Sequence, residues 1–379
     1  VVLSRRCNPG ETAVAPSNLE YALGQNLVLL RADGTRIYPA FLRWLVRGPE
    51  WWRQISKFIN AGAVFDSLKC GDIPNFELRI PPLPEQRAIA HVLGTLDDKI
   101  ELNRRMSETL ETMARALFKS WFVDFDPVRA KCRGEPACSP QFGQVPQSGQ
   151  AHRPAPTKWP QHILDLFPDR FVDSELGEIP EGWEVKMIGD VAEHPRRSIR
   201  PESMETNAPY IALEHMPKRH IALPDWGTTK GLQSNKFEFR KGEILFGKLR
   251  PYFHKVGVAP LNGVCSTDIV VVTPRSEHWF GFVLGHLSSS EFVEYTNAGS
   301  TGTKMPRTSW REMARYEVVV PQEDVARAFN EQIQLSVGRI IKSIHESCAL
   351  AALRDTLLPK LISGELCVKD AEKFIGRVS

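Results

Sequence analysis

The stretch Gly242–Lys255, "GEILFGKLRPYFHK", begins with the spacing G-x-x-x-x-G-K of a phosphate-cradling loop. Such a loop precedes a helix, and the residue after its lysine is a Ser or Thr that binds magnesium. Here that residue is Leu249. The run is instead rich in residues typical of strands. We therefore interpret it as a strand that ends in cations and aromatic rings, and not as an ATP site.

Strands of this kind can bind nucleic acid, because cations bind phosphates and Arg, Lys, Asn or Gln reach base edges. Lys236–Lys255 holds six Lys or Arg against two Glu, interleaved with aromatic residues. Their alternation predicts that the rings face the core and the cations face solvent. The predicted DNA contacts here are Lys248, Arg250, Tyr252 and Lys255. The alternative is an ordinary solvated surface.

A second cluster, "STGTKMPRTSW" at Ser300–Trp310, combines two cations with several hydroxyls, which suits a loop that follows a phosphate backbone. Its predicted contacts are Thr303, Lys304, Arg307 and Ser309. Weaker candidates are Arg196, Arg197, Arg200 and Lys218–His220.

Catalytic and metal sites find little support. The chain has neither an Asp/Asn-Pro-Pro-aromatic tetrapeptide nor a glycine-rich turn for a methyl donor, so it is not predicted to be a methyltransferase. Pairs such as Glu184 and Lys186 could suggest a nuclease, but with 25% charged residues such pairs occur everywhere. The seven cysteines contain no C-x-x-C and the ten histidines no H-x-x-x-H, so we predict no metal and no cofactor.

The composition is that of a soluble globular protein with room for two or three domains: 379 residues, 42% hydrophobic and 25% charged. The net charge is only +3, so a nucleic-acid footprint must be local. Apolar runs such as Ile269–Val272 are too short to span a membrane. Scattered, unpaired cysteines indicate reduced thiols, and we expect a cytoplasmic protein.

The sequence contains an internal repeat, and the repeat indicates which elements hold these clusters in place. Four matches recur in the same order: "VVLSRR…VAP" with "LFGKLR…VAP", "NLVLLRA" with "IVVVTPR", "FINAG" with "YTNAG", and "FELRIPPLP" with "YEVVVP". The last pair predicts a strand that ends in proline in each copy, at Phe76–Pro84 and Tyr316–Pro321, before a long helix. The first copy thereby offers Arg5, Arg6 and Lys69 as DNA contacts of its own.

The two copies differ at their front ends. The second begins near Ser174 and runs about seventy residues before Leu245, whereas the first starts at the equivalent of Leu245, with Val at position 1. We expect that the chain is a fragment lacking the front of its first domain.

Each copy ends in a helix whose apolar residues recur every three or four positions, the pattern of a narrow seam buried against another helix. The predicted pairing residues are Ile89, Leu93, Leu96, Ile100, Asn103, Leu110 and Leu117 in the first helix and Ile333, Val337, Ile340 and Ile344 in the second. Polar seam residues such as Asn103 commonly fix register. The alternative is two ordinary amphipathic core helices.

Three long stretches resemble one family, the specificity subunits of Type I restriction-modification enzymes. They are "IPPLPEQRAIAHVLGTLDDKIELNRRMSETLETMARALFKSWFVDFDPVRAK" at Ile80–Lys131, "LFPDRFVDSELGEIPEGWEV" at Leu166–Val185 and "LRDTLLPKLISGEL" at Leu353–Leu366. The resemblance implies an α+β protein with two similar target-recognition domains, separated by two long helices that pack as an antiparallel coiled coil. It also implies a non-catalytic subunit that reads a split site in double-stranded DNA and binds methyltransferase and restriction endonuclease subunits.

The resulting domain prediction is a first recognition domain at residues 1–83, a first long helix at 84–121, a linker at 122–173, a second recognition domain at 174–320, and a second long helix with the C-terminal segment at 321–366. Two alternatives stay open. One is a fragment that assembles with partners but no longer reads DNA, and the other is an enzyme in its own right.

Overall fold

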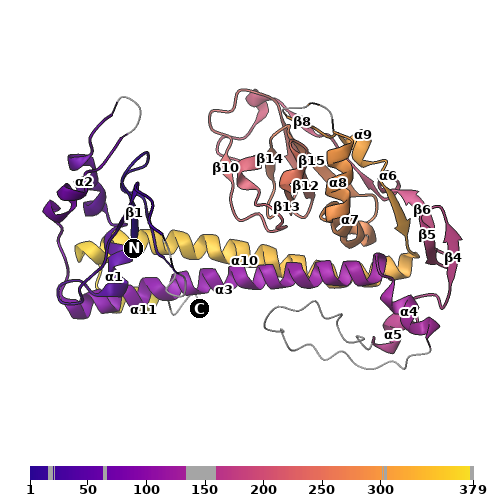
Figure 1. Cartoon of the computed structure of the whole chain (residues 1–379), viewed down its shortest axis with the longest axis horizontal. Coiled ribbons are helices and arrows are strands. Elements are labelled where there is room, and N and C mark those ends of the chain that lie inside the picture. The colour runs from indigo at the N-terminus through magenta and orange to yellow at the C-terminus, as the bar shows by residue number, and fades with distance from the viewer. Residues whose placement is uncertain are drawn as a thin grey trace. The chain divides into compact units, whose positions relative to one another are not determined.

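The computed structural model describes residues 1–15, 20, 22–62, 66–133, 159–300, 302 and 305–375. The chain divides into two compact units, Val1–Leu102 with Glu346–Ser379, and Asn103–His345. We call them the first and the second unit and describe each by itself. Both mix helices with strands, as predicted for an α+β protein, and two long helices, α3 (Leu83–Phe122) and α10 (Glu323–Ser363), contribute to both (Figure 1).

The first unit begins with a small antiparallel sheet of order β2-β1-β3, formed by β1 (Val2–Ser4), β2 (Thr12–Ala13) and β3 (Leu27–Leu29). Two helices follow, α1 (Pro39–Leu45) and α2 (Pro49–Phe58), and each has proline in its first turn, where no backbone N–H is missed. A 3₁₀ turn, η1 (Cys70–Asn75), leads toward α3, and α11 (Val368–Ile375) follows the end of α10.

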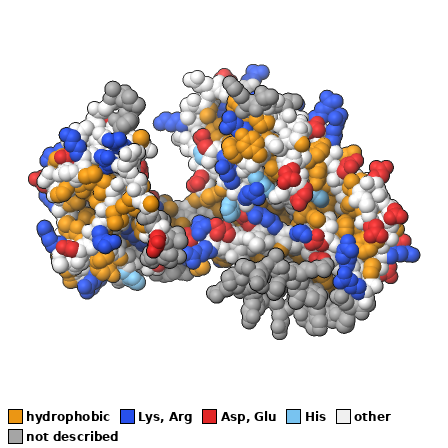
Figure 2. Space-filling model, in the orientation of Figure 1, with side chains coloured by type: hydrophobic (Ala, Val, Ile, Leu, Met, Phe, Trp, Pro, Cys, Tyr) orange, Lys and Arg blue, Asp and Glu red, His pale blue; other side chains and the backbone are white. Residues whose placement is uncertain are grey.

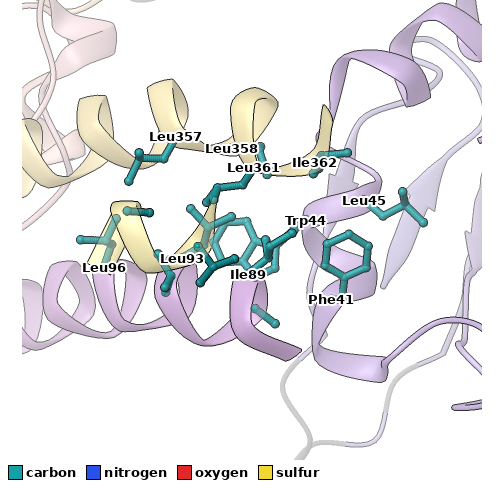
Figure 3. Close-up of a cluster of buried hydrophobic side chains, with 14 of the residues drawn as sticks. Phe41, Trp44, Leu45, Ile89, Leu93, Leu96, Leu357, Leu358, Leu361 and Ile362 are labelled. Carbon is teal, nitrogen blue, oxygen red and sulfur yellow. The ribbon is translucent and has the colours of Figure 1, made fainter. Parts of the chain in front are cut away.

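A core of aliphatic and aromatic side chains joins α1, α3, α10 and α11 in the first unit (Figure 3). Leu361 of α10 and Ile89 and Leu93 of α3 are completely buried in it. At its border Arg354 of α10 donates to Asp97 of α3 over 2.6 Å. The start of α3 therefore lies against the end of α10, so the helices are antiparallel in this unit.

The second unit contains most of the strands. A hairpin of β4 (Phe171–Ser174) and β5 (Gly177–Pro180) precedes β6 (Glu184–Met187), α6 (Ile188–Val191) and β7 (Ala192–Glu193). A five-stranded sheet has the order β10-β9-β14-β11-β8, and a four-stranded sheet the order β13-β12-β15-β7. The remaining strands are β8 (Ser198–Ile199), β9 (Pro209–Ile211), β10 (Gly227–Thr228), β11 (Lys236–Phe239), β12 (Ile244–Gly247), β13 (Val256–Val258), β14 (Gly263–Cys265), β15 (Ile269–Pro274) and β16 (Glu317–Val320).

The two larger sheets enclose a shared core. Phe239 and Cys265 from the five-stranded sheet pack with Leu245, Ile269 and Val271 from the four-stranded sheet. The helices α7 (Phe280–Leu287), α8 (Ser290–Ala298) and α9 (Trp310–Met313) follow β15, and α4 (Asp126–Cys132) and α5 (Gln161–Leu164) come before the hairpin. Strand β16 pairs with β6 along four residues.

The helix pair continues in the second unit. The rings of Phe118, Trp121 and Phe122 near the end of α3 surround Phe329 near the start of α10, with centroid distances of 6.3, 5.6 and 4.8 Å. The helices are therefore antiparallel in this unit as well. Ile333, Val337, Ile340 and Ile344 are buried.

The seam of α3 differs from the predicted ladder after Asn103. Leu110 and Leu117 are only half-buried, whereas their neighbours Glu111 and Phe118 are buried. A straight helix turns every 3.6 residues, so a ladder of period 3.5 drifts around it. Phe118 also packs tightly against α7, because a Cβ atom added at Gly285 of that helix would overlap its ring.

Backbone hydrogen bonds show the internal repeat directly. The N–H of Leu68 donates to Arg5 O as that of Thr308 does to Lys248 O, and Cys7 N–H donates to Asp66 O as Arg250 N–H does to Pro306 O. Cys7 and Arg250 also share a left-handed backbone, with φ of 67° and 51°. Arg5 is thus the counterpart of Lys248, one residue from the alignment expected from sequence.

Two expectations about the repeat were wrong. Tyr295–Ala298 of "YTNAG" lie inside α8, whereas Ile59–Gly62 of "FINAG" follow the end of α2, so these letters do not align equivalent positions. Residues 76–80 form no strand, although their counterpart β16 does. A strand forms only where a neighbouring strand accepts and donates its hydrogen bonds, and the described part of the first unit contains no strand equivalent to β6.

Within the residues that the structure describes, no helix is long and apolar enough to cross a bilayer.

A histidine in the core of the second unit predicts acid sensitivity. The Nε2 atom of His286 is buried without a hydrogen-bond partner, and its ring contacts those of Phe118 and Phe282 at 4.8 and 4.5 Å. Burial lowers its pKa from 6.5 to about 3. Below pH 6.5 His286 binds a proton in the unfolded chain but not in the folded chain, so the free energy of unfolding falls as the pH falls.

We expect the unfolding free energy of the second unit to drop by about 2 kcal/mol from this group between pH 7 and pH 5. Urea titrations at both pH values, followed by tryptophan fluorescence, measure it. His286→Phe should remove this part of the pH dependence, and His162→Gln, at an exposed position, should leave it. An unchanged dependence in His286→Phe would contradict the assignment.

Candidate nucleic-acid interface

Three loops of the second unit meet where β12 ends. The N–H of Lys248 donates to Asp268 O over 2.9 Å, and Lys248 O accepts from Thr308 N over 3.1 Å. Arg250 N donates to Pro306 O over 2.8 Å. The motif Gly242–Lys248 therefore consists of a turn and a buried strand, and the cations after it are joined to the loop that carries Arg307.

Four charged residues gather at this junction, and we call Arg196, Lys248, Asp268 and Arg307 the cationic junction. Arg307 is exposed and pairs with Asp268 at 3.1 Å. Burial lowers the pKa of Lys248, and the neighbouring charges of Arg307 and Arg196 lower it further, against the attraction of Asp268. Three cations against one carboxylate leave a local positive charge, which suits a phosphate.

Arg250 stands at the edge of this junction in a left-handed backbone conformation, just before the 3₁₀ turn η4 (Pro251–Phe253). Its Nε atom is buried without a hydrogen-bond partner. Because Cys7 adopts the same backbone at the equivalent place, the unusual φ belongs to the turn of the fold.

The expected alternation of rings inward and cations outward was wrong for two lysines. Lys236 is buried, and its Nζ donates to the carbonyl and hydroxyl of Ser234 over 3.0 and 2.6 Å. Lys255 Nζ donates to the carbonyl of Leu213. Burial lowers the pKa of Lys255, and nearby Lys218 lowers it further. Both ammonium groups are therefore held by backbone carbonyls.

Tyr252 is one of the aromatic residues that face solvent. Its side chain is 50% exposed and lies beside the ring of Phe253, at 4.7 Å between centroids. The ammonium of Lys218 lies over the ring of Phe253, 4.7 Å from its centroid.

In the loop Ser300–Trp310, Thr303 and Lys304 lie outside the described residues. Ser309 caps α9, because its hydroxyl accepts the N–H of Glu312 over 3.3 Å. Arg307 is the predicted contact of this loop that the structure brings to the junction.

The weaker candidates divide. Arg196 belongs to the junction, whereas Arg197 pairs with the buried carboxylate of Glu243. His220 lies 3.3 Å from the buried carboxylate of Glu111 on α3, which also accepts the N–H of Ala222 over 3.0 Å. This contact fixes the loop 218–222 to the helix.

The first unit arranges Arg5, Arg6 and Lys69 in the equivalent way. Arg5 O accepts from Leu68 N over 2.8 Å, and Arg6 forms a bridge with Ser67. Arg5 Nε donates to Gln25 O over 2.9 Å, and Lys69 is exposed.

Sequence reasoning missed Asp268, an acidic residue at the centre of a basic cluster. Asp268 stands just before the strand Ile269–Pro274, and the strand register of the structure, not the sequence alignment, matches it with Asn26 before Leu27. On the visible face of the second unit, Lys and Arg side chains alternate with Asp and Glu (Figure 2). A DNA-binding surface on this face must therefore be local, as the small net charge of the chain indicates.

Comparisons with known proteins show what this chain is similar to. Residues 10–112 match the family model of the Type I restriction modification DNA specificity domain. The chain is 25% identical to the Type I restriction enzyme HindI specificity subunit of Haemophilus influenzae, over 91% of this chain and 81% of that protein. It is also 25% identical to the MjaIX specificity subunit of Methanocaldococcus jannaschii, over 98% of this chain and 78% of that protein.

Among solved structures, the S subunit of the Type-I restriction-modification system from M. genitalium has a similar fold. The match covers 95% of this chain and 82% of that one, with a TM-score of 0.50 and 15% identity. The chain is therefore similar over most of its length to specificity subunits of Type I restriction enzymes, and its residues 10–112 match the DNA specificity domain of Type I restriction-modification systems.

Proposed function

We propose that this chain reads a split site in double-stranded DNA, one half with each repeat, and holds methyltransferase and restriction endonuclease subunits at that site in the cytoplasm. The observation that carries the proposal is the recurrence of one surface in both repeats. Arg5 in the first and Lys248 in the second directly follow equivalent strands, and each is joined by backbone hydrogen bonds to a loop with a further cation, Lys69 or Arg307.

In the second unit the chemistry divides between phosphates and bases. Lys248, Arg196 and Arg307 supply positive charge that binds the phosphates of the DNA backbone. Arg307 can exchange its ion pair with Asp268 for one with a phosphate. The freed carboxylate then accepts a hydrogen bond from a base edge, as acidic residues do from the amino group of cytosine.

The first unit offers a different group at the same position. The N–H of Arg5 donates to Asn26 O as that of Lys248 does to Asp268 O. An amide both donates and accepts, which matches the edge of adenine better than that of cytosine. The two repeats are therefore expected to prefer different half-sites.

Methyl transfer and cleavage belong to the partner subunits in this proposal, and the chain itself acts by binding. The partners reach their target bases by flipping them out of the duplex. The helices α3 and α10 connect the two reading repeats along the chain, and the proposal assigns partner docking to them.

Selection from randomised duplex DNA tests the proposal, using this chain co-purified with its methyltransferase subunit. A split motif would show that both repeats read DNA. A single half-site would confine recognition to 174–321. Partner binding with salt-dependent but sequence-independent DNA binding would favour the non-reading assembly fragment. Methyl transfer or cleavage by the purified chain alone would contradict the non-catalytic role.

Replacing the central carboxylate tests the base contact. Asp268→Asn keeps the shape of the side chain but converts an acceptor into a donor and acceptor. We expect the preferred base to change at one position of one half-site, and affinity for the original site to fall about tenfold, the typical value of one base contact. The same selection measures both, with Glu193→Gln as an exposed control in the same unit. An unchanged motif would remove Asp268 from base reading.

A further inference from the structure

The 3₁₀ turn η4 presents two aromatic rings at the surface of the second unit. Tyr252 is 50% exposed, and its ring lies 4.7 Å from that of the half-buried Phe253, at an interplanar angle of 60°. The ammonium of Lys218 covers the ring of Phe253. A single exposed ring is ordinary on a protein surface. Two further features distinguish Tyr252, which are the backbone that holds it and the charges on both sides of it.

The backbone of η4 is fixed at both of its ends. Arg250 before the turn and His254 after it have left-handed conformations, with φ of 51° and 52°. The N–H of Phe253 donates to Arg250 O over 3.0 Å. The N–H of His254 donates to Pro251 O over 2.8 Å, and the side chain of Pro251 is buried. Because the turn is already ordered, Tyr252 loses little conformational freedom when its ring binds a ligand.

Cations lie at both ends of this turn. At its start, the N–H of Arg250 donates to Pro306 O, which joins η4 to the cationic junction. At its end, the N–H of Arg219 donates to His254 O over 2.8 Å, which joins η4 to the loop 218–222. The side chains of Lys218 and Arg219 in that loop are exposed. We call Lys218 and Arg219 the second cationic group.

The loop that carries the second cationic group is fixed to α3. The buried carboxylate of Glu111 accepts the N–H of Ala222 over 3.0 Å and lies 3.3 Å from Nδ1 of His220. Arg115 of α3 donates to Glu111 over 3.1 Å and also to the carbonyl of Arg219. The cations at this end of η4 are therefore held in place before any ligand binds.

A fixed aromatic ring between two groups of cations matches one feature of DNA, the step between two base pairs with a phosphate on each side. The flat face of an aromatic ring stacks on the flat face of a base, and this contact is worth about 1–3 kcal/mol. Proteins that insert a side chain at a base step unstack it at a cost of a few kcal/mol and recover that cost through further contacts. Cations beside the ring provide such contacts, because they bind the neighbouring phosphates.

The equivalent turn of the first unit has no such ring. The N–H of Gly247 donates to Lys255 O across η4, and that of Ser4 donates to Glu11 O across the equivalent turn. The connection is one residue shorter in the first unit, and its sequence "RRCNPG" contains no aromatic residue. The aromatic turn is therefore a feature of the second repeat and not of the recurring fold.

We propose that Tyr252 enters one base step of the DNA half-site bound by the second repeat and stacks on a base, while the cationic junction and the second cationic group bind the phosphates on either side. This inference rests on the proposed DNA reading by that repeat. Pyrimidine–purine steps are the easiest to unstack. The half-site therefore prefers such a step at this place without any hydrogen bond to its bases.

Binding to nicked duplexes tests the inference. A nick that keeps its phosphate leaves every base in place but makes one step easier to open. The chain, co-purified with its methyltransferase subunit, is titrated by fluorescence anisotropy onto the selected duplex with a nick at each step in turn. We expect one step of one half-site at which the nick raises the affinity about tenfold, because the protein no longer has to unstack it.

Two variants assign this effect to the ring. In Tyr252→Ala the nick should change the affinity by less than about twofold at every step, because no side chain enters the stack. Tyr252→Phe should keep the full effect, because stacking needs the ring and not the hydroxyl. The thermal midpoint of both variants should equal that of the parent chain, because the side chain is half-exposed.

Three results would each overturn the inference. They are an equal nick effect in Tyr252→Ala, a flat nick profile in the parent chain, and loss of the effect in Tyr252→Phe, which would assign a hydrogen bond of the hydroxyl instead. A chain that binds no specific duplex would overturn the proposed function as well, whereas specific binding with a flat profile overturns this inference alone.

The second cationic group is tested separately. Replacing Lys218 and Arg219 together with alanine should make the slope of log affinity against log salt shallower by about two, because two fewer counterions are released. The nick effect should stay at the same step, because Tyr252 is unchanged. An unaltered salt slope would show that these two cations bind no phosphate and would overturn that part of the proposal.

Discussion

Replacing Leu361 with aspartate is expected to unfold the first unit. The side chain is completely buried between α1, α3 and α11, where Ile89, Leu93 and Trp44 are also completely buried. The change removes a large aliphatic group and places a carboxylate among carbon atoms without an ionic partner. The expected loss is about 5 kcal/mol, which equals the whole stability of many domains.

Circular dichroism with urea titration measures this loss, and amide exchange shows whether it is confined to the first unit. Leu335→Asp is the matched control, since Leu335 lies on the same helix but is 72% exposed. The control should stay within about 0.5 kcal/mol of the parent chain. A folded Leu361→Asp variant would mean that α10 does not need this core.

Replacing Lys248 and Arg307 together with alanine is expected to reduce DNA affinity of the second repeat about 30-fold at physiological salt, since each lost cation removes an interaction of roughly 1 kcal/mol. The slope of log affinity against log salt should become shallower by about two, because two fewer counterions are released. Fluorescence anisotropy with a labelled duplex over a range of salt concentrations measures both quantities.

The charge-matched control is Arg170→Ala with Lys186→Ala. Both side chains are exposed and belong to the same unit, Arg170 pairing with the half-buried Glu181 and Lys186 with the exposed Glu184. This variant has the same net charge as the first but keeps the cationic junction. If both variants lose affinity equally, net charge and not the junction explains binding.

Several features followed from the sequence because they depend on local pattern. Apolar residues at every third or fourth position predicted two long helices, and α3 and α10 span Leu83–Phe122 and Glu323–Ser363. Strand-forming runs beside turn residues predicted β12 and β15. The resemblance to a known family was recognisable because the stretches that carry it are long and specific in sequence.

Other features needed contacts between distant segments. Lys255 was predicted to face DNA, but its ammonium is held by the carbonyl of Leu213, and Lys236 is buried against Ser234. A strand pattern says which face a side chain takes, but not whether a distant carbonyl will bind its charge. Residues 76–80 have the pattern of a strand, yet a strand also needs a partner to bond.

The sequence by itself determined the repeat, the two long helices and the resemblance to a known family, because periodicity and long motifs can be recognised without knowledge of neighbours in space. Only the tertiary structure decided the one-residue register between repeats, the place of Asp268 among three cations, and the exposure of Leu27 and Leu29 on β3 against the burial of Ile269 and Val271 on β15. These depend on which surfaces meet, because hydrogen bonding and burial are properties of pairs of segments and not of one segment alone.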